Sequence, residues 1–287
     1  MDSIFDIFLV ATPGLEEPLA AEARALGWTP AIQPGGVTIR GGWPDVWAAN
    51  LRLRGATRVL ARVGGFRAMH LAQLDKRARK FPWAEVLRPD VPVKVETVSR
   101  ASKIYHAGAA TQRIERAIAE TLGAPLGGEG AVVVKARIKD DLVTFSLDTT
   151  GESLHKRGHK EAVAKAPMRE TMAAMFLRQM GFDPMNPVPV LDPMCGSGTF
   201  VIEAAEMAAG LAPGRSRSFA FQQLATFDRA ACEALRAQAT GTAPAIFFGS
   251  DRDAGAVRMA RANAERAGVD AFTSFQTLAI ADLQPPE

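Results

Sequence analysis

Residues 190–200 read VLDPMCGSGTF, and this stretch decides the fold of the C-terminal part of the chain. Its apolar start predicts a short buried strand over 190–192, and the residues after Gly198 predict a helix over 200–209. The two glycines between them, Gly196 and Gly198, let the backbone approach a ligand closely, and the start of a helix offers free N–H groups. The stretch therefore predicts a strand, a ligand-binding loop and a helix in succession.

The loop differs from the common nucleotide-binding loops. Phe200 and Val201 follow Gly198, so the third glycine of the dinucleotide pattern G-x-G-x-x-G is missing, and no Gly-Lys-Ser or Gly-Lys-Thr is present. Asp192 would repel a pyrophosphate but suits a ligand with a positively charged amino group. S-adenosylmethionine, which carries an ammonium, a carboxylate and a sulfonium, fits this loop better than a nicotinamide dinucleotide, the cofactor of the rival dehydrogenase interpretation.

Further strands and helices alternate around this unit. Residues 167–180, 228–239 and 254–267 predict helices, and residues 245–248 and 271–276 predict strands. Such alternation is typical of a parallel, doubly wound sheet, which binds ligands at the carboxyl ends of its strands. Asp251 and Asp282 follow the second and third strands, where they would accept hydrogen bonds from a ribose and from an adenine amino group. The alternative is that Asp192 caps a helix and that Asp251 and Asp282 are turn residues.

The first 160 residues predict a different, α+β architecture. The predicted strands are 4–12, 37–40, 59–63, 91–98, 132–138 and 142–147, and the predicted helices are 16–26, 44–53, 71–80 and 109–122. The last two strands flank Lys139-Asp140-Asp141, which predicts an antiparallel hairpin. A chain of 287 residues is long enough for roughly two domains, which agrees with this change of pattern.

Charge is distributed unevenly along the chain. Residues 51–165 hold 22 Lys and Arg against 12 Asp and Glu, whereas the segments before and after them are net acidic. This block predicts either a surface for a polyanion such as RNA or a solvated basic face. The sequence has no stretch of about 18 apolar residues and no signal peptide, and its two cysteines favour a reducing, cytoplasmic setting.

Five segments also resemble one family. LDPMCGSGTFVIEAA at 191–205 is similar to the cofactor motif of the THUMP-containing RNA guanine-N2 methyltransferases, the bacterial large-subunit ribosomal RNA enzymes in particular. APMRET at 166–171 resembles the helix before their sheet, and LDTTGESLHKRG at 147–158 resembles the end of their THUMP domain. GSDRD at 249–253, with RANA at 261–264, resembles their second strand and following helix. Residues 8–22 resemble the start of their ferredoxin-like region, so the resemblance spans the whole chain.

The resemblance implies a ferredoxin-like subdomain (1–50), a THUMP RNA-binding domain (51–160) and a Rossmann-like class I methyltransferase domain (161–287). It implies transfer of a methyl group from S-adenosylmethionine to N2 of a guanosine in RNA, with 23S ribosomal RNA as the expected partner and no metal or membrane. The expected cofactor-binding residues are Asp192, Pro193, Cys195, Gly196, Gly198, Thr199, Asp251 and Asp282. The expected RNA-binding residues are Arg100, Ser102, Lys103, Lys156 and Arg157.

The sequence departs from the family at the catalytic loop. The family's Asn-Pro-Pro-Tyr is missing, and Gln284-Pro285-Pro286-Glu287 has neither the Asn nor an aromatic residue. We therefore expect an incomplete methyltransferase domain, truncated before that loop, and no methyl transfer by residues 1–287 alone. A non-catalytic RNA-binding or assembly protein and a transfer-RNA guanine-N2 methyltransferase are the alternatives. Cys195 in the cofactor loop is expected to pack rather than act as a nucleophile, and His155 and His159 lack a third zinc ligand.

Overall fold

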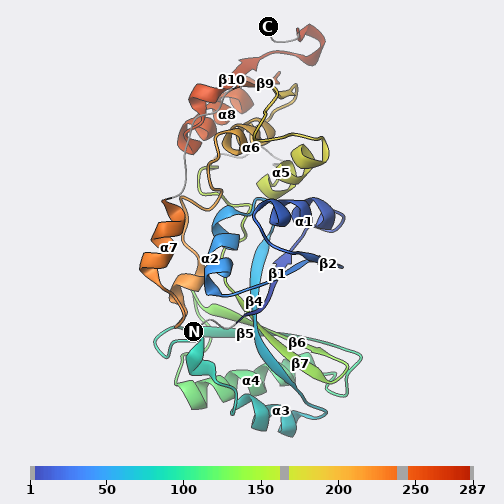
Figure 1. Ribbon diagram of the computed structural model, residues 1–287, viewed down its shortest axis with the longest axis vertical. Helices are drawn as coiled ribbons and strands as arrows, with labels where there is room; N and C mark the ends of the chain where they lie inside the picture. Colours follow the sequence, from blue (N-terminus) through green and yellow to red (C-terminus); the bar gives the residue numbers. More distant parts are fainter. Residues whose placement is uncertain (1–3, 162–167, 238–244, 285–287) are drawn as a thin grey trace.

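The computed structural model describes residues 4–161, 168–237 and 245–284. Two sheets organise the chain, and they lie at opposite ends of an elongated molecule (Figure 1). The N-terminal sheet has seven strands in the order β2-β3-β1-β4-β7-β6-β5, and the C-terminal sheet has three in the order β10-β9-β8. The expected α+β half followed by a Rossmann-like half is thus confirmed.

The first half of the N-terminal sheet is a ferredoxin-like unit. β1 (Phe5–Val10) pairs antiparallel with β3 (Gly36–Gly41) and with β4 (Arg58–Arg67), and α1 (Glu16–Ala25) and α2 (Trp43–Arg52) pack against these strands. A short edge strand, β2 (Ala31–Gln33), was not predicted; two of its three residues are exposed, so it carries no apolar alternation. β4 extends four residues beyond its predicted end and continues into the second half of the sheet.

Within the described residues, the second half of the N-terminal sheet has helices on one face only. α3 (Leu71–Ala78) and α4 (Ala107–Leu122) cover β5 (Val93–Arg100), β6 (Val132–Lys139) and β7 (Leu142–Asp148) from one side (Figure 1). β6 and β7 form the predicted antiparallel hairpin. Asp140 and Asp141 make its turn with φ of 51° and 61°, a conformation that Asp tolerates better than most residues.

The C-terminal sheet is parallel, as predicted. It contains β8 (Leu191–Asp192), β9 (Phe247–Asp251) and β10 (Thr273–Thr277). α6 (Thr199–Ala208) and α8 (Ala254–Ala267) pack on these strands, and α5 (Glu170–Gln179) packs on α6. α8 has the predicted bounds because Asp253 caps its start, accepting a hydrogen bond from the N–H of Gly255 at 2.7 Å. The predicted helix start at 167, the helix end at 238–239 and residues 285–287 lie outside the described residues.

One helix does not belong to the doubly wound layer as the alternating pattern indicated. α7 (Arg229–Arg236) lies against α2 of the N-terminal unit instead of the parallel sheet (Figure 1). Aromatic packing holds the segment before α7 there: Trp47 of α2 contacts Phe221 and Phe227, with ring centroids 6.5 and 6.2 Å apart. Burial of these large rings favours docking of this segment on the first domain.

A buried ion-pair network joins the two halves. Arg54, just after α2, donates to Glu203 Oε1 on α6 at 2.7 Å and lies 3.4 Å from Glu206 Oε2. All three side chains are at most 6% exposed. Glu206 also accepts from Arg215 at 2.6 Å. Charges buried this deeply are stable only when paired, so the network fixes the two halves against each other. None of the described helices is long and apolar enough to cross a membrane.

Candidate cofactor and RNA sites

The predicted cofactor residues gather at the carboxyl edge of the parallel sheet. Asp192 ends β8 and Asp251 ends β9, and these strands are adjacent. The segment after β10 returns to the same edge, since the N–H of Leu278 donates to the carbonyl of Asp251 at 3.0 Å. Asp282 follows in a short 3-10 helix, Ile280–Asp282, and its side chain is exposed. Asp192 and Asp251 therefore lie at the glycine loop, and Asp282 lies on the exposed segment that follows β10.

Asp251 connects the second strand to the glycine loop. Its Oδ2 accepts a hydrogen bond from the N–H of Gly196 at 3.0 Å, and its Oδ1 accepts from the N–H of Asp253 at 2.9 Å. The backbone N–H of Cys195 donates to the carbonyl of Ser250 at 2.9 Å. Because a carboxylate has about four acceptor positions, Asp251 keeps acceptor capacity for a ligand while it holds the loop.

Gly196 and Gly198 have different structural roles in the loop. Both adopt left-handed conformations, with φ of 52° at Gly196 and 86° at Gly198. A Cβ at Gly198 would lie 3.0 Å from the Cβ of Ala260 on α8, so this glycine allows close packing of loop and helix. A Cβ at Gly196 would meet no atom within 4 Å, so it would project into open space above the loop. That space is where a ligand would approach the backbone.

The electrostatics of this edge favour a positively charged group. Burial raises the pKa of Asp192, and the neighbouring carboxylate of Asp251 raises it further, whereas the hydrogen bond from the N–H of Met194 at 3.0 Å opposes both. A cation placed between the two carboxylates would relieve their repulsion. The buried Oγ of Ser250 has no hydrogen-bond partner within the described residues. The residues present thus fit the ammonium and hydroxyl groups of S-adenosylmethionine.

The remaining loop residues have structural partners. Cys195 is buried, and burial together with Asp192 and Asp251 raises the pKa of its thiol to about 12, so it does not form a thiolate near neutral pH. Thr199 begins α6, and its Oγ1 accepts a hydrogen bond from Lys160 Nζ at 2.8 Å. Pro193 is half-buried in the turn before Cys195.

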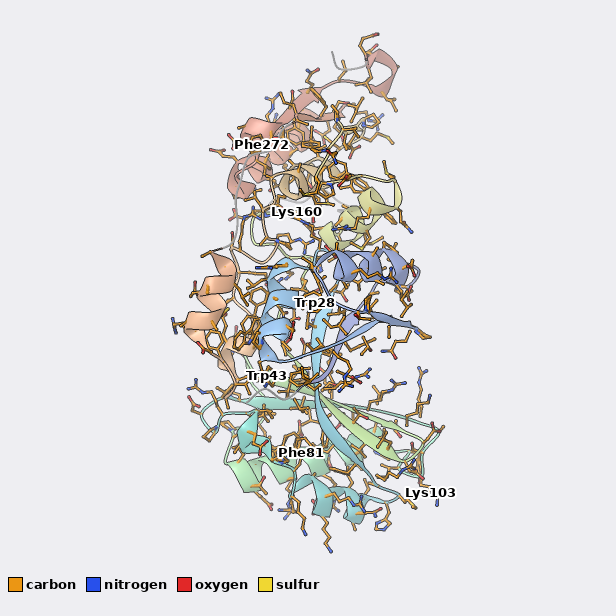
Figure 2. The ribbon with its side chains drawn as sticks, viewed as in Figure 1. Trp28, Trp43, Phe81, Lys103, Lys160 and Phe272 are labelled. Atoms are coloured by element: carbon orange, nitrogen blue, oxygen red, sulfur yellow. The ribbon has the colours of Figure 1, made fainter. Side chains whose placement is uncertain are left out.

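Lys160 is a site residue that sequence reasoning missed. Besides Thr199, its ammonium contacts the carbonyl of Met168 at 2.9 Å and Glu170 Oε1 at 3.2 Å (Figure 2 labels Lys160). It therefore connects the segment 149–160, which we call the linker, to the start of α5 and the start of α6. Its only sequence signal was a Gly-, His- and Lys-rich segment. Asn263 of α8 supports the same loop, donating to the carbonyl of Ser197 at 3.1 Å.

The expected RNA residues separate into two groups. Arg100, Ser102 and Lys103 lie together: the N–H of Lys103 donates to Asp141 Oδ1 at 2.8 Å, and Ser102 Oγ accepts from the N–H of Asp141 at 3.1 Å. The loop 101–105 is thereby held against the β6–β7 turn. Arg100 and Lys103 are exposed, so they remain candidates for contact with RNA.

Lys156 and Arg157 lie in the linker, far from that group along the chain. Lys156 is exposed, pairs with Glu152, and borders a cavity of about 430 Å³ that is also lined by His155, Lys160 and Arg169. Arg157 is a correction to the sequence interpretation, because its side chain is only 1% exposed. It donates to the carbonyls of Leu154 and Arg54 at 2.8 Å each and to Glu203 at 3.0 Å, so it stabilises the domain junction and is not available to RNA.

The two histidines of the linker have different partners. His155 Nδ1 lies 2.9 Å from Ser153 Oγ, whereas His159 is buried with Nδ1 3.7 Å from Glu206 Oε1. Within the described part of the chain, no cluster of three or more His, Cys, Asp or Glu side chains is arranged to hold a metal ion.

The parallel sheet, the glycine loop and the carboxylate edge define a class I methyltransferase domain that uses S-adenosylmethionine. Similarity to known protein families identifies the family of this chain. Residues 157–287 match the RMKL-like methyltransferase domain, and residues 6–60 match the RlmL ferredoxin-like domain. The chain is 30% identical, over 97% of its length, to a protein of Synechocystis sp. assigned as an RNA methyltransferase, of which it covers 76%. The chain belongs to this RMKL-like methyltransferase family.

Two further relatives agree. The chain is 32% identical, over 99% of its length, to the ribosomal RNA large subunit methyltransferase K/L of Syntrophotalea carbinolica, and it spans 42% of that protein's length. A solved structure described as a methyltransferase in complex with SAH matches the whole chain with a TM-score of 0.85 and 28% identity, and the match covers 78% of that chain. The resemblance to ribosomal RNA methyltransferases that was inferred from the sequence motifs is thus confirmed at the level of the family.

Proposed function

We propose that this chain forms the cofactor- and RNA-binding part of an enzyme that transfers a methyl group from S-adenosylmethionine to N2 of a guanosine in large-subunit ribosomal RNA. The observation that carries the methyltransferase chemistry is the pair of carboxylates, Asp192 and Asp251, at adjacent strand ends around the open face of Gly196. The RNA substrate is supported by the names of the two curated relatives, and the target base is supported by the motif resemblance alone.

In this proposal the chain's own residues bind and orient the cofactor. Asp192 holds the ammonium group, and Asp251 accepts hydrogen bonds from the ribose hydroxyls. Asp282 accepts from the adenine amino group, while Gly196, Gly198 and the start of α6 leave backbone N–H groups for the carboxylate. Pro193, Cys195 and Thr199 shape the loop. When bound, S-adenosylmethionine supplies an activated methyl group that needs no metal for transfer.

The N-terminal part holds the substrate. We propose that residues 51–160 form a THUMP domain beside a ferredoxin-like subdomain at 1–50, and that residues 161–287 form the first half of the methyltransferase domain. The excess of Lys and Arg over 51–165 matches a phosphodiester backbone, whose contacts position an RNA without reading its sequence. The buried network around Arg54 would keep the bound RNA at a fixed distance from the cofactor loop.

The acceptor step would use an Asn-Pro-Pro-aromatic loop, which the sequence of residues 1–287 does not contain. In the family this loop stacks on the guanine and accepts hydrogen bonds from its amine. We therefore propose that residues 1–287 alone bind the cofactor and RNA without turnover.

The target is tested in the source cells. Deletion of the gene should remove one N2-methylguanosine from large-subunit ribosomal RNA, as measured by mass spectrometry of nuclease digests. Loss of N2-methylguanosine from transfer RNA would favour the transfer-RNA alternative. No change in any methylated nucleoside would favour the non-catalytic assembly protein. Purified residues 1–287, assayed with tritiated S-adenosylmethionine and unmodified ribosomal RNA, should show cofactor binding but no incorporation.

A further inference from the structure

The second half of the N-terminal sheet has one face that the described helices leave open. Val93, Val95, Val134 and Ile138 point toward α3 and α4 and are buried. The alternate residues of the same strands point to the opposite side, because successive side chains of a strand alternate. We refer to this side of β4, β7, β6 and β5 as the open face. Figure 1 shows α3 and α4 together on the other side of these strands.

Four cations stand close together at one end of the open face. Strand register places Arg100 of β5 opposite Lys139 of β6, Lys139 opposite Leu142 of β7, and Leu142 opposite Arg67 of β4. Arg137 lies two residues before Lys139, on the same face, between Val98 and Thr144. We call Arg67, Arg100, Arg137 and Lys139 the distal cluster. All four are exposed.

Asp140 and Asp141 lie in the β6–β7 turn beside the distal cluster, but neither carboxylate forms an ion pair with it. None of its four side chains forms an ion pair with any residue in the described ranges, and only Arg67 donates a hydrogen bond, to the carbonyl of Asp140 at 3.3 Å. Like charges opposite each other destabilise a sheet. The sequence therefore keeps an electrostatic cost at this end of the sheet.

At the other end of the same face, the cations are paired with an acid. There Glu96 of β5 lies 3.2 Å from Lys94 Nζ and 2.5 Å from Lys135 Nζ. The same two strands thus carry ion-paired lysines at one end and cations without an ion pair, within the described residues, at the other. A general preference for basic surface would not produce this difference, whereas a binding site for an anion at the distal end would.

The spacing of the cations in the distal cluster suits a nucleic acid strand. Neighbouring strands are about 4.8 Å apart, so the row from Arg100 to Arg67 spans roughly 14 Å, and Arg137 adds a second row about 7 Å away. The predicted RNA residue Lys103 lies at the same end, since its loop is held to Asp141 in the β6–β7 turn (Figure 2 labels Lys103). Several phosphates of one backbone could contact this area together.

We infer that the distal cluster binds the phosphodiester backbone of the RNA substrate, and that the open sheet face, not the helical face or the linker, is the main electrostatic docking surface of the N-terminal half. This inference rests on the proposed function for the identity of the ligand. Of the four residues of the distal cluster, the sequence predicted only Arg100 as an RNA-binding residue.

The test compares two double variants of the 287-residue chain that change charge equally. Arg137→Gln/Lys139→Gln removes two cations from the distal cluster, and Arg113→Gln/Arg116→Gln removes two exposed cations from α4 on the covered side. The probe is a fluorescein-labelled, unmodified transcript of large-subunit ribosomal RNA, with binding measured by anisotropy from 50 to 300 mM KCl. Far-UV circular dichroism and S-adenosylmethionine affinity establish that both variants are folded.

The distal variant should bind the transcript about tenfold more weakly, and the slope of log K against log salt should fall by roughly two. The α4 variant should keep the wild-type affinity and slope. Equal affinities for the distal variant and wild type, with wild type binding RNA, would overturn this inference but leave the proposed function standing. A larger loss in the α4 variant would also overturn it. Failure of wild type to bind the transcript would count against the proposed RNA substrate itself.

Discussion

Arg54 and Glu203 are 149 residues apart in the chain, yet their side chains meet at 2.7 Å in the buried junction between the two halves. Burial opposes the ionisation of Glu203, but the charges of Arg157 and Arg54 hold the pKa of its carboxyl below the ordinary value. The pair therefore connects the RNA-binding candidate surface to the helix that follows the cofactor loop, and it makes the junction sensitive to single changes.

Glu203→Gln should destabilise the protein strongly, because it leaves Arg157 and Arg54 buried with one carboxylate fewer. Breaking a buried pair costs about 3–5 kcal/mol, and urea denaturation would measure it. Glu17→Gln breaks an exposed pair with Arg24 at 3.1 Å and is the matched control, with an expected cost of at most about 1 kcal/mol. Equal costs for the two variants would show that the junction network does not hold the halves together.

Asp251→Asn should weaken S-adenosylmethionine binding by roughly 10- to 100-fold, because hydrogen bonds to a charged acceptor contribute about 1.5–3 kcal/mol. The asparagine keeps one oxygen that can accept from the N–H of Gly196, so the loop should persist. Asp270→Asn changes the same charge at the amino end of β10, on the opposite edge of the sheet, and should leave binding unaltered. Isothermal titration calorimetry measures both, and unchanged affinity in Asp251→Asn would remove this residue from the site.

Lys160→Met should also weaken cofactor binding, through loss of its contacts to Thr199, Glu170 and the carbonyl of Met168. Lys160 acts by positioning the two helix starts, so Lys160→Arg should recover part of the affinity. A loss in Lys160→Met without recovery in Lys160→Arg would point to a specific role of the ammonium. Hydrogen exchange at the start of α6 should increase in Lys160→Met, which separates positioning from direct contact.

Cys195→Ala should keep S-adenosylmethionine affinity within a few-fold of wild type, because the thiol is buried and protonated. With a pKa of about 12, the thiol should resist iodoacetamide at pH 8 while the protein is folded and react once urea unfolds it. Mass spectrometry of the peptide that contains residue 195 measures the modification. Rapid alkylation of the folded protein, or a covalent adduct with RNA, would contradict the packing role.

His155→Gln should make stability less dependent on pH between about 6.5 and 4. Burial, and then the charge of Arg169, lowers the pKa of His155 to about 4 in the folded protein, so the unfolded chain binds the proton first as pH falls. The contribution of the neutral histidine to stability is therefore complete above about pH 6.5 and is lost toward pH 4. Urea midpoints at pH 7.5, 6 and 5 measure it, and parallel curves for variant and wild type would contradict this assignment.

Most of the secondary structure could be predicted from local pattern. Alternation of apolar and polar residues predicted β5, and the turn residues Lys139-Asp140-Asp141 predicted the hairpin of β6 and β7. α8 has the predicted bounds because its Asp253 cap and terminal Gly268 are both visible in the sequence. The sequence did not predict where α7 would dock, because its apolar face gives no indication of which neighbour covers it. Trp47 and Phe227, distant in sequence, decide that.

The candidate sites also contain residues that the sequence predicted and residues that it did not. The glycine loop and Asp251 could be inferred from the sequence, because strand ends of a parallel sheet converge on one edge whatever the rest of the chain does. Arg157 could not be assigned correctly, since a basic residue in a polar linker has the same sequence pattern whether it is exposed or buried. Glu203 and Glu206, two acids within an apolar helix, were the available sign of a buried partner.

The sequence by itself determined the order of strands and helices, the ligand loop and the family, because these depend on local periodicity and on short motifs. Only the tertiary structure decided which charges face water, which are buried in the junction, and which cations of three separate strands stand together on the open face. Register and burial arise from pairing between distant segments, and a linear pattern of Lys and Arg does not contain that information.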